Sequence, residues 1–441
     1  WGSPVCSPFR ATLYSGEYAY QHGIGTIIPE GSATVLGTER DNLQKLAADS
    51  GVASGLFGKW HVGETSTTPD GATSATLDYA EYPIQTGFTW FAGNMDGQLN
   101  SHTNWLYTVS QPNTSNASGY QTTAVTQTAE ATGKTTDDAI AWMEAQSATG
   151  TRRFAVVSYN LPHFTGTASS RTWADGATAC GGTATSDHVT NYNLGMECLD
   201  TRLWDLLDRI PDLDETLIVL TADNGTDSSN TEGLFDENGR GKNSPYEGGV
   251  RVPFMLADGA ALQAALDNGG ILPEGGSWLV DAGSVVDDAT STVDIFATVA
   301  DFLDLSSATC TVGETCAVQS QTLRPVLTGE VATRESTWTE RYSVTGGGVY
   351  TGIAAVRTGD TKLVIKVATA TGNCRDFEMY DVVNDRWEQS DLIYEPGWLS
   401  ERQELLELVD AHAAAMAADG VNWLPASSCD PCLVPEVWYD G

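Results

Sequence analysis

The segment Leu217-Ile218-Val219-Leu220-Thr221-Ala222-Asp223-Asn224-Gly225 joins a short apolar run to a polar turn. A continuous apolar run of this length is typical of a strand that is buried on both faces. Residues 154–159 form a similar run. The stretch between the two runs carries apolar side chains at helical spacing, namely Leu194, Cys198, Leu199, Leu203, Leu206, Leu207 and Ile210. Strand, helix and strand in this order predict an α/β fold with a parallel sheet covered by helices on both faces.

Polar side chains follow both predicted strands at the point where each ends. Pro162-His163 comes after the first strand, and Asp223-Asn224 comes after the second. Ligands of open α/β sheets bind beyond the carboxyl ends of the strands. A histidine there suits general acid catalysis, and adjacent Asp and Asn oxygens suit a hard cation such as calcium. The ordinary alternatives are a hydrogen-bonded loop histidine and an Asp-Asn-Gly turn.

Two earlier segments also carry groups with useful chemistry. Cys6-Ser7-Pro8-Phe9-Arg10 places a cysteine and an arginine on either side of a proline; the alternative is a buried or disulfide-bonded cysteine in a Pro-rich turn. In Gly58-Lys59-Trp60-His61, the lysine and the histidine are two residues apart and face the same side of an extended segment. A lysine supplies the point charge that sulfate or phosphate oxygens need. On its own, this pair is more often a surface lysine and a core histidine.

Taken in chain order, these motifs resemble the sulfatase family. Residues 6–16 are similar to its first signature, residues 58–61 to its second, and Lys242 with residues 246–253 to its Lys…Glu-Gly-Gly-x-Arg-Val-Pro run. Weaker landmarks follow at residues 86–91, 293–296, 323–327, 356–363 and 379–381. The resemblance implies a doubly wound, mostly parallel sheet flanked by helices, with a smaller C-terminal antiparallel sheet plus helix. It places a catalytic domain in residues 1–344 and a small α+β subdomain in residues 345–441.

The resemblance also implies a set of residue roles for sulfate ester hydrolysis. Cys6 becomes formylglycine, whose hydrate is the nucleophile, and Arg10 anchors it. Lys59 and Lys242 hold the sulfate group. His61 supports the nucleophile, and His163 protonates the leaving alcohol. Asp223 and Asn224, together with the group derived from Cys6, bind calcium, with magnesium as an alternative.

Two features depart from the family pattern. Phe9 stands where a small residue, usually serine, precedes the motif arginine. Sulfatases also carry an upstream strand that ends in paired aspartates, and we interpret Asp287-Asp288 as a solvated acidic loop rather than a replacement. We therefore expect that an N-terminal segment, such as a separate fragment, supplies this strand, or that another element takes its place. The alternative functions are a catalytically inactive, sulfatase-like structural or interaction protein and a phosphonate or phosphodiester hydrolase.

Composition limits the classes of partner that the protein is expected to bind and indicates where it is located. The 441 residues carry a net charge of −36, which disfavours nucleic acid as a partner. There is no run of 18 apolar residues, so we expect no membrane span. We expect the substrate to be a sulfated small molecule or polysaccharide. Sequons at Asn113 and Asn116 and eight cysteines favour a secreted glycoprotein with a few disulfide bonds.

The cysteine spacing and several local patterns give further expectations. Cys310 can close a small loop with Cys316, and Cys180 with Cys198 can bracket a glycine loop, whereas the Cys429–Cys432 pair lacks a zinc partner. A helix is predicted over residues 136–147 with Thr135 or Thr136 as its N-cap. Strands are predicted at 350–356 and 361–368, and the last helix is predicted to begin at Ser400 with Gln403 completing a capping box.

Overall fold

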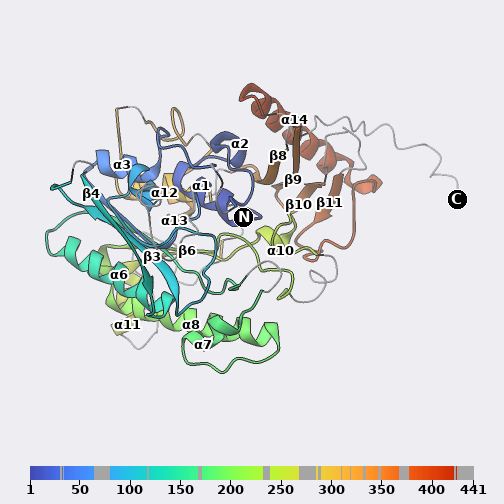
Figure 1. The fold of residues 1–441 in the computed structure, drawn as a ribbon. Coiled ribbons are helices and arrows are strands. Elements are labelled where there is room, and N and C mark those ends of the chain that lie inside the picture. The colour runs from blue at the N-terminus through green and yellow to red at the C-terminus, as the bar shows by residue number, and fades with distance from the viewer. Residues whose placement is uncertain are drawn as a thin grey trace.

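The computed structural model describes residues 1–29, 32, 34–63, 80–116, 119–166, 171–231, 239–267, 285–286, 290–308, 310–317, 319–330, 334–345, 349–366, 377–421 and 424. A large mixed sheet with helices on both faces forms one part of the molecule, and an antiparallel sheet with a long helix lies beside it (Figure 1). The predicted α/β fold class is confirmed.

The large sheet has the strand order β4-β3-β2-β1-β5. Its strands are β1 (Ala53–Lys59), β2 (Trp90–Asn94), β3 (Trp105–Pro112), β4 (Tyr120–Gln127) and β5 (Arg153–Ser158). The central strand β1 pairs in parallel with both β2 and β5, while β3 and β4 are added antiparallel at the far edge. All residues of β1 except the first are buried, as expected for a strand covered on both faces.

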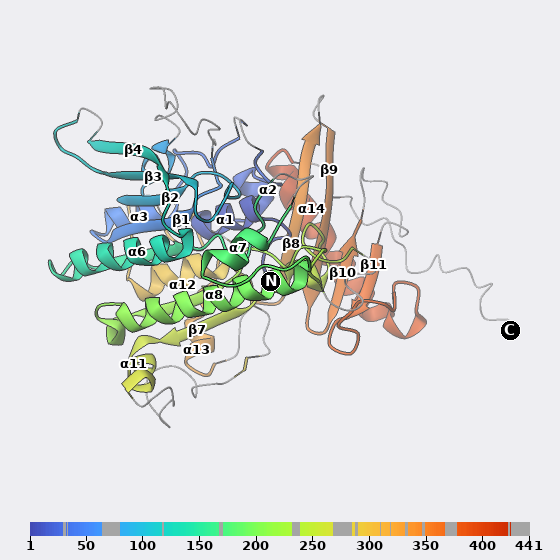
Figure 2. The same ribbon diagram turned by 60° about the horizontal axis from the view of Figure 1, so that its bottom comes forward.

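Helices cover both faces of this sheet. On one face lies α6 (Ala131–Ser147), with α8 (His188–Arg209) packed alongside it (Figure 2). On the other face are α1 (Cys6–Ser15), α3 (Leu43–Asp49) and α12 (Asp294–Phe302). Phe57, which points toward α6, and Leu56, which points the other way, belong to separate apolar clusters. The alternation of side chains along β1 therefore supplies both halves of the core.

The two apolar runs predicted as strands are confirmed as β5 and β6 (Leu217–Thr221), but they do not pair with each other. Instead, β6 pairs antiparallel with β7 (Phe254–Asp258) in a two-stranded sheet. Every residue of β5 and of β6 is only half-buried, in contrast to β1. Among the described residues, each of these strands has one edge without a hydrogen-bonded neighbour.

Arginine side chains connect β5 and β6 at both ends. At the start, Arg153 donates to the Pro211 carbonyl oxygen (2.7 Å) and to the Asp212 carboxylate (3.1 Å). At the finish, Arg10 donates to Ser158 Oγ (2.5 Å) and to Asp223 Oδ2 (3.1 Å). The two strands thus lie side by side with unpaired edges and half-exposed apolar side chains. We call this arrangement the β5–β6 gap.

The second sheet has the order β11-β10-β9-β8 and is antiparallel throughout. Its strands are β8 (Thr337–Thr345), β9 (Val349–Thr358), β10 (Thr361–Ile365) and β11 (Phe377–Asp381), and α14 (Leu399–Ala418) packs on it. The predicted strand pair around residue 359 is confirmed. The domain division at residue 345 stays a prediction, and this sheet itself already begins at Thr337.

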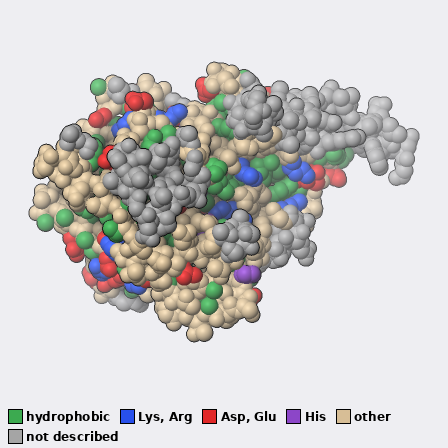
Figure 3. Space-filling view, viewed as in Figure 1, with side chains coloured by type: hydrophobic (Ala, Val, Ile, Leu, Met, Phe, Trp, Pro, Cys, Tyr) green, Lys and Arg blue, Asp and Glu red, His purple; other side chains and the backbone are tan. Residues whose placement is uncertain are grey.

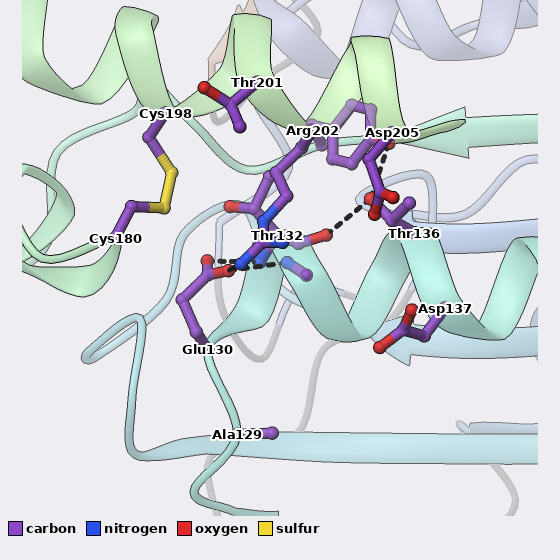
Figure 4. A network of polar contacts seen from close by, with 12 residues as sticks. Ala129, Glu130, Thr132, Thr136, Asp137, Cys180, Cys198, Thr201, Arg202 and Asp205 are labelled. Atoms are coloured by element: carbon purple, nitrogen blue, oxygen red, sulfur yellow. Dashed lines mark hydrogen bonds and ion pairs between the residues drawn. A yellow bond between two sulfur atoms is a disulfide. The ribbon is translucent and has the colours of Figure 1, made fainter. Parts of the chain in front are cut away.

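The predicted starts of two helices are wrong. A single 3-10 turn, Pro396–Trp398, runs directly into α14, so this helix begins at Leu399 with Trp398 at its N-cap and no side-chain cap. The helix predicted from residue 136 begins five residues earlier, at Ala131, because Glu130 caps it. Both Glu130 carboxylate oxygens accept backbone N–H groups, from Thr132 and Gly133, at 2.6 Å (Figure 4).

Two predicted disulfide bonds are present. Cys180–Cys198 ties the end of α7 (Ala174–Ala179) to α8, close to Glu130 and Arg202 (Figure 4), and Cys310–Cys316 closes a short loop. The Cys429–Cys432 pair and Asp287-Asp288 lie outside the described residues. The remaining short elements are α2 (Ala19–His22), α5 (Tyr82–Gln85), η1 (Leu213–Glu215), α10 (Glu247–Val250), α11 (Gly259–Asp267) and α13 (Arg324–Leu327). No helix in the described part of the chain has both the length and the apolar character needed to cross a bilayer.

Candidate active site

Cys6 is the first residue of α1 and is buried. Its sulfur lies 3.3 Å from Asn224 Oδ1 and 3.2 Å from Lys242 Nζ. If Cys6 is oxidised to formylglycine, this sulfur stands for an oxygen of the hydrated aldehyde. The start of a helix carries partial positive charge, which favours an anionic nucleophile there.

Arg10 follows Cys6 by one helical turn and holds the site together. Its guanidinium donates to the Lys59 carbonyl oxygen at 2.8 Å, in addition to Ser158 and Asp223. One side chain therefore connects the carboxyl ends of β1 and β5 with the turn after β6. This explains how residues far apart in sequence meet at one edge of the fold.

Two lysines bring positive charge to Cys6. Lys59 ends β1 and is 2% exposed, and this burial lowers its pKa to about 8. Burial also disfavours the charged form of Lys242, but the charges of Cys6 and Asp223 outweigh burial and raise its pKa. Burial would likewise raise the pKa of the Cys6 thiol, yet the charges of Lys242 and Lys59 hold it well below its ordinary value. The pocket is thus built to stabilise negative charge at position 6.

Two histidines complete the surroundings of Cys6. The backbone of His61 is left-handed (φ 55°). Its Nε2 atom lies 3.2 Å from the Ile28 carbonyl oxygen. Burial lowers its pKa to about 4, although the neighbouring Cys6 acts in the opposite direction. His163 follows β5, and its Nδ1 lies 2.9 Å from the Phe164 carbonyl oxygen. Burial lowers the pKa of His163 too, and the neighbouring Cys6 again opposes the shift.

Asp223 and Asn224 present oxygen atoms on the other side of Cys6. Asp223 is paired with Arg10, and the amide oxygen of Asn224 faces the sulfur of Cys6. Carboxylate and amide oxygens have the right chemistry for calcium or magnesium. Two side chains fall short of the roughly six to eight oxygens that calcium takes. The donor types fit the ion, and the remaining donors must come from elsewhere.

A different group of metal-binding side chains lies away from this site. Glu130, Cys180 and Cys198 are the one set of three His, Cys, Asp or Glu ligands that the described residues bring close enough together to hold an ion. The two sulfur atoms are joined in a disulfide bond, and the Glu130 carboxylate caps α6. These atoms are therefore already engaged.

The structure brings together all eight residues that the sequence singled out. They come from the first turn of α1, the end of β1, and the segments that follow β5 and β6, and are Cys6, Arg10, Lys59, His61, His163, Asp223, Asn224 and Lys242. Their catalytic and metal-binding roles stay predictions.

Sequence reasoning missed several polar residues around these eight. Ser158 accepts a hydrogen bond from Arg10, and its position at the end of a predicted strand was the available signal. Asn160 donates to Asn94 Oδ1 at 2.8 Å, which links the ends of β5 and β2. His102 is 1% exposed, and neither ring nitrogen has a hydrogen-bond partner among the described residues. No motif marks Asn160, Asn94 or His102.

A cysteine at a helix start, flanked by two lysines and two histidines at the carboxyl edge of an α/β sheet, is typical of a hydrolase for anionic esters. The sulfatase family model matches residues 1–305, and the chain belongs to the sulfatase family.

Individual relatives match this chain over different extents. Human steryl-sulfatase is 30% identical over 97 residues, which are 21% of this chain and 15% of that protein. The matched stretch is thus a small part of the curated relative. The crystal structure of Ps i-CgsB has a TM-score of 0.67 at 20% identity and covers 97% of this chain and 85% of its own. BT4656, solved with its substrate D-glucosamine-2-N,6-O-disulfate, has a TM-score of 0.61 at 14% identity, covering 94% and 89%. At these identities the structures show a shared fold.

Proposed function

We propose that this protein hydrolyses a sulfate ester with a formylglycine formed from Cys6. The observation that carries the proposal is the setting of Cys6, which is buried at the start of α1, 3.2 Å from Lys242 Nζ and 3.3 Å from Asn224 Oδ1. Both lysines lower the pKa of the group at this position. The same charges would stabilise the oxygens of a bound sulfate and the negative charge that develops on them.

Each side chain around Cys6 has a distinct task in this proposal. Lys59 and Lys242 bind sulfate oxygens, and Arg10 fixes the first turn of α1 against β1 and β5. His163, in its protonated form, donates a proton to the alcohol oxygen when the bond between sulfur and oxygen breaks. His61 lies beside residue 6, held by its contact with the Ile28 carbonyl oxygen, and supports the nucleophile. The formylglycine hydrate supplies one hydroxyl for attack on sulfur and a second one that lets sulfate leave as the aldehyde re-forms.

The modification is tested by mass spectrometry of the peptide that contains Cys6, from protein purified from its native source. The expected change is the loss of sulfur and the gain of oxygen. An assay with a small aryl sulfate then tests turnover. An unmodified thiol and no hydrolysis would contradict the proposal.

We propose calcium, or alternatively magnesium, as the cation held by Asp223, Asn224 and the group at position 6. The ion would contribute positive charge next to the nucleophile. We further propose that an extended segment fills the β5–β6 gap and brings the missing carboxylates. The unpaired edges and half-exposed apolar side chains of both strands support this. Asp223 and Cys6 lie at the carboxyl end of the gap, where such a segment would end.

Experiments on protein from its native source test whether a further segment fills the β5–β6 gap. Gels run with and without reductant, with N-terminal sequencing of every band, identify a separate fragment if one is present. Calorimetry with calcium measures the metal site. If the sequenced bands contain no additional strand and calcium does not bind, the filled gap is wrong.

That same outcome would favour the second candidate function, a catalytically inactive, sulfatase-like protein. The specific observation in its favour is the small number of metal ligands in the described residues. A phosphonate or phosphodiester hydrolase remains the third candidate, and parallel assays with an aryl sulfate and an aryl phosphodiester separate it from the first.

For the substrate we propose a sulfated saccharide. We also propose that the protein is secreted and meets this substrate outside the cell. The fold relatives support this choice, since BT4656 was solved with a glucosamine disulfate and Ps i-CgsB with a neocarrahexaose. The two disulfide bonds are consistent with an oxidising compartment. Assays with sulfated oligosaccharides and recovery of the protein from culture medium test the two parts separately.

A further inference from the structure

A positively charged side chain lies on the rim of the candidate site and has no part in the roles above. Arg171 is exposed, and its guanidinium carbon lies 4.8 Å from the centre of the Phe164 ring. Its NH1 group donates to Asp227 Oδ2 at 2.9 Å. A guanidinium stacked on an aromatic ring keeps a fixed plane, so its other N–H groups point in defined directions.

The contacts of Arg171 place it between the two halves of the site. Phe164 directly follows His163, and the two rings are 4.4 Å apart. On the other side, Asp227 directly follows Thr226, whose carbonyl oxygen accepts the backbone N–H of Lys242 at 2.8 Å. Arg171 therefore connects the residue next to the proposed general acid with the loop that holds a proposed sulfate-binding lysine.

The local structure gives this arginine a rigid support. Thr165 and Thr172 exchange two backbone hydrogen bonds, at 2.9 and 3.0 Å, directly next to Arg171. The buried Trp173 packs edge-on against Phe164, with 5.7 Å between the ring centres. Phe164 therefore contacts Trp173 as well as the guanidinium of Arg171, which lies over its ring.

The guanidinium of Arg171 has N–H donors left for a ligand. Within the described residues, its one polar partner is Asp227, which engages a single N–H group of the five. Carboxylate and sulfate oxygens match the remaining donors in pairs.

We propose that Arg171 binds a second anionic group on the leaving-group side of the substrate. This deepens the proposed function, on which it rests. The substrate class is then a sulfated saccharide with a further carboxylate or sulfate group next to the ester that is cleaved. Arg171 selects for that group, while Lys59 and Lys242 hold the sulfate that is removed.

The test compares two substrates that differ in one charge. The first is a disaccharide with one sulfate ester and one uronic acid carboxylate, and the second is the same disaccharide with the carboxylate reduced to an alcohol. We expect Arg171→Ala to lower kcat/KM at least tenfold more for the first than for the second, mainly through KM, which matches the loss of a charge-assisted hydrogen bond. Arg171→Lys keeps the charge but loses the paired donors, so its effect is expected to lie in between.

Arg209→Ala is the matched control. Arg209 has nearly the same exposure, 40% against 39% for the Arg171 side chain, and in the last turn of α8 it pairs with Asp205 of the same helix and with Asp137 of α6. It should leave the ratio of the two substrates unchanged. An equal loss for both substrates in Arg171→Ala, or no loss for either, would overturn the proposal.

A calorimetric arm keeps the inference testable if the protein hydrolyses no sulfate ester. Binding of the same two disaccharides is then measured for the wild type and for Arg171→Ala. Preference of the wild type for the carboxylated disaccharide, lost in the variant, supports Arg171 as the anion site even though the proposed function has failed. Equal binding of both disaccharides, or none, overturns it.

Discussion

At the scale of single residues, burial decides the charge state of the important groups. Lys59, His61 and His163 are removed from water around one sulfur atom, and burial shifts the pKa of each toward the neutral form. Lys242 differs because Cys6 and Asp223 keep it charged. It is therefore the cation on which the site depends most directly.

Replacement of this cation gives the first prediction. Lys242→Ala is expected to lower kcat/KM for an aryl sulfate by about 10²-fold or more, since one transition-state charge partner is lost. Lys366→Ala is the control, because Lys366 is a half-exposed lysine paired with Glu378 in the second sheet. Steady-state kinetics of both variants check the expectation. Equal activities would mean that Lys242 does not contact the sulfate.

A second residue links pH to stability rather than to catalysis. His22 is buried, its Nδ1 accepts the N–H of Ile24 at 3.1 Å, and its Nε2 lies 3.1 Å from Thr12 Oγ1. A protonated ring cannot accept the first of these bonds. Burial accordingly lowers the pKa of His22 from 6.5 to about 3.

The sign of the effect follows from these two values. Above pH 6.5 the ring is neutral in both states, and the contribution to stability is present in full. As the pH falls from 6.5 toward 3, the unfolded chain binds the proton first and stability is lost. Between pH 7 and pH 5 we expect His22 to account for a loss of about 2 kcal/mol in the free energy of unfolding. Urea unfolding should show a smaller pH dependence for His22→Gln, and an unchanged dependence would contradict this account.

At the scale of elements, the structure rests on how helices and strands begin and end. The start of α6 shows this, because Glu130 satisfies two backbone N–H groups and also lies 3.4 Å from Arg202 on α8. One carboxylate thus serves both the first turn of a helix and its packing against a neighbour. The negative charge also suits the positive end of the helix.

The cap gives the third prediction. Glu130→Ala is expected to destabilise the protein by about 1 kcal/mol, the usual cost of losing an N-cap. Glu144→Ala, on the exposed side of the same helix, should change stability by less than about 0.5 kcal/mol. Chemical unfolding of both variants measures the difference. A similar effect of both would show that the cap does not contribute.

The same elements show what the sequence could predict. The strands at residues 154–159 and 217–221 were predictable because continuous apolar runs leave few alternatives. The partner of β6 was not, because its pairing with β7 depends on contacts outside the strand itself. The Glu130 cap was missed since serine, threonine, aspartate and asparagine are the usual caps. The eight site residues were found through motifs, whereas Arg171 and His102 lie in segments without one.

At the scale of the whole molecule, the second sheet is joined to α10 by a buried ion cluster. Lys362 of β10 is fully buried and pairs with Glu247 of α10 at 3.0 Å and with Glu388 at 2.8 Å. Its Nζ also lies 4.6 Å from the centre of the Trp1 ring. The small sheet is thereby fastened close to the segment that carries Lys242. Elsewhere, acidic side chains are scattered over the face shown in Figure 3.

The overall charge leads to the fourth prediction. A net charge of −36 repels anionic substrates at long range, although the pocket itself collects Arg10, Lys59 and Lys242. Added salt screens the repulsion, so kcat/KM for an anionic saccharide is expected to rise with ionic strength. Kinetics over a range of salt concentrations check this. An aryl sulfate, whose one charge is that of its ester, serves for comparison and should respond less to salt. A steep fall with salt would contradict it.

The burial of Cys6 has a consequence for the order of events during biosynthesis. Its thiol is 2% exposed, and α1 packs against α12, which is made almost three hundred residues later. Lys242, whose Nζ lies 3.2 Å from the sulfur, is also synthesised long after residue 6. If Cys6 is oxidised as proposed, this burial means that a modifying enzyme reaches the thiol only while the chain is still being made or is unfolded. Protein that folds before the oxidation would then stay unconverted, so folding and oxidation would compete in time.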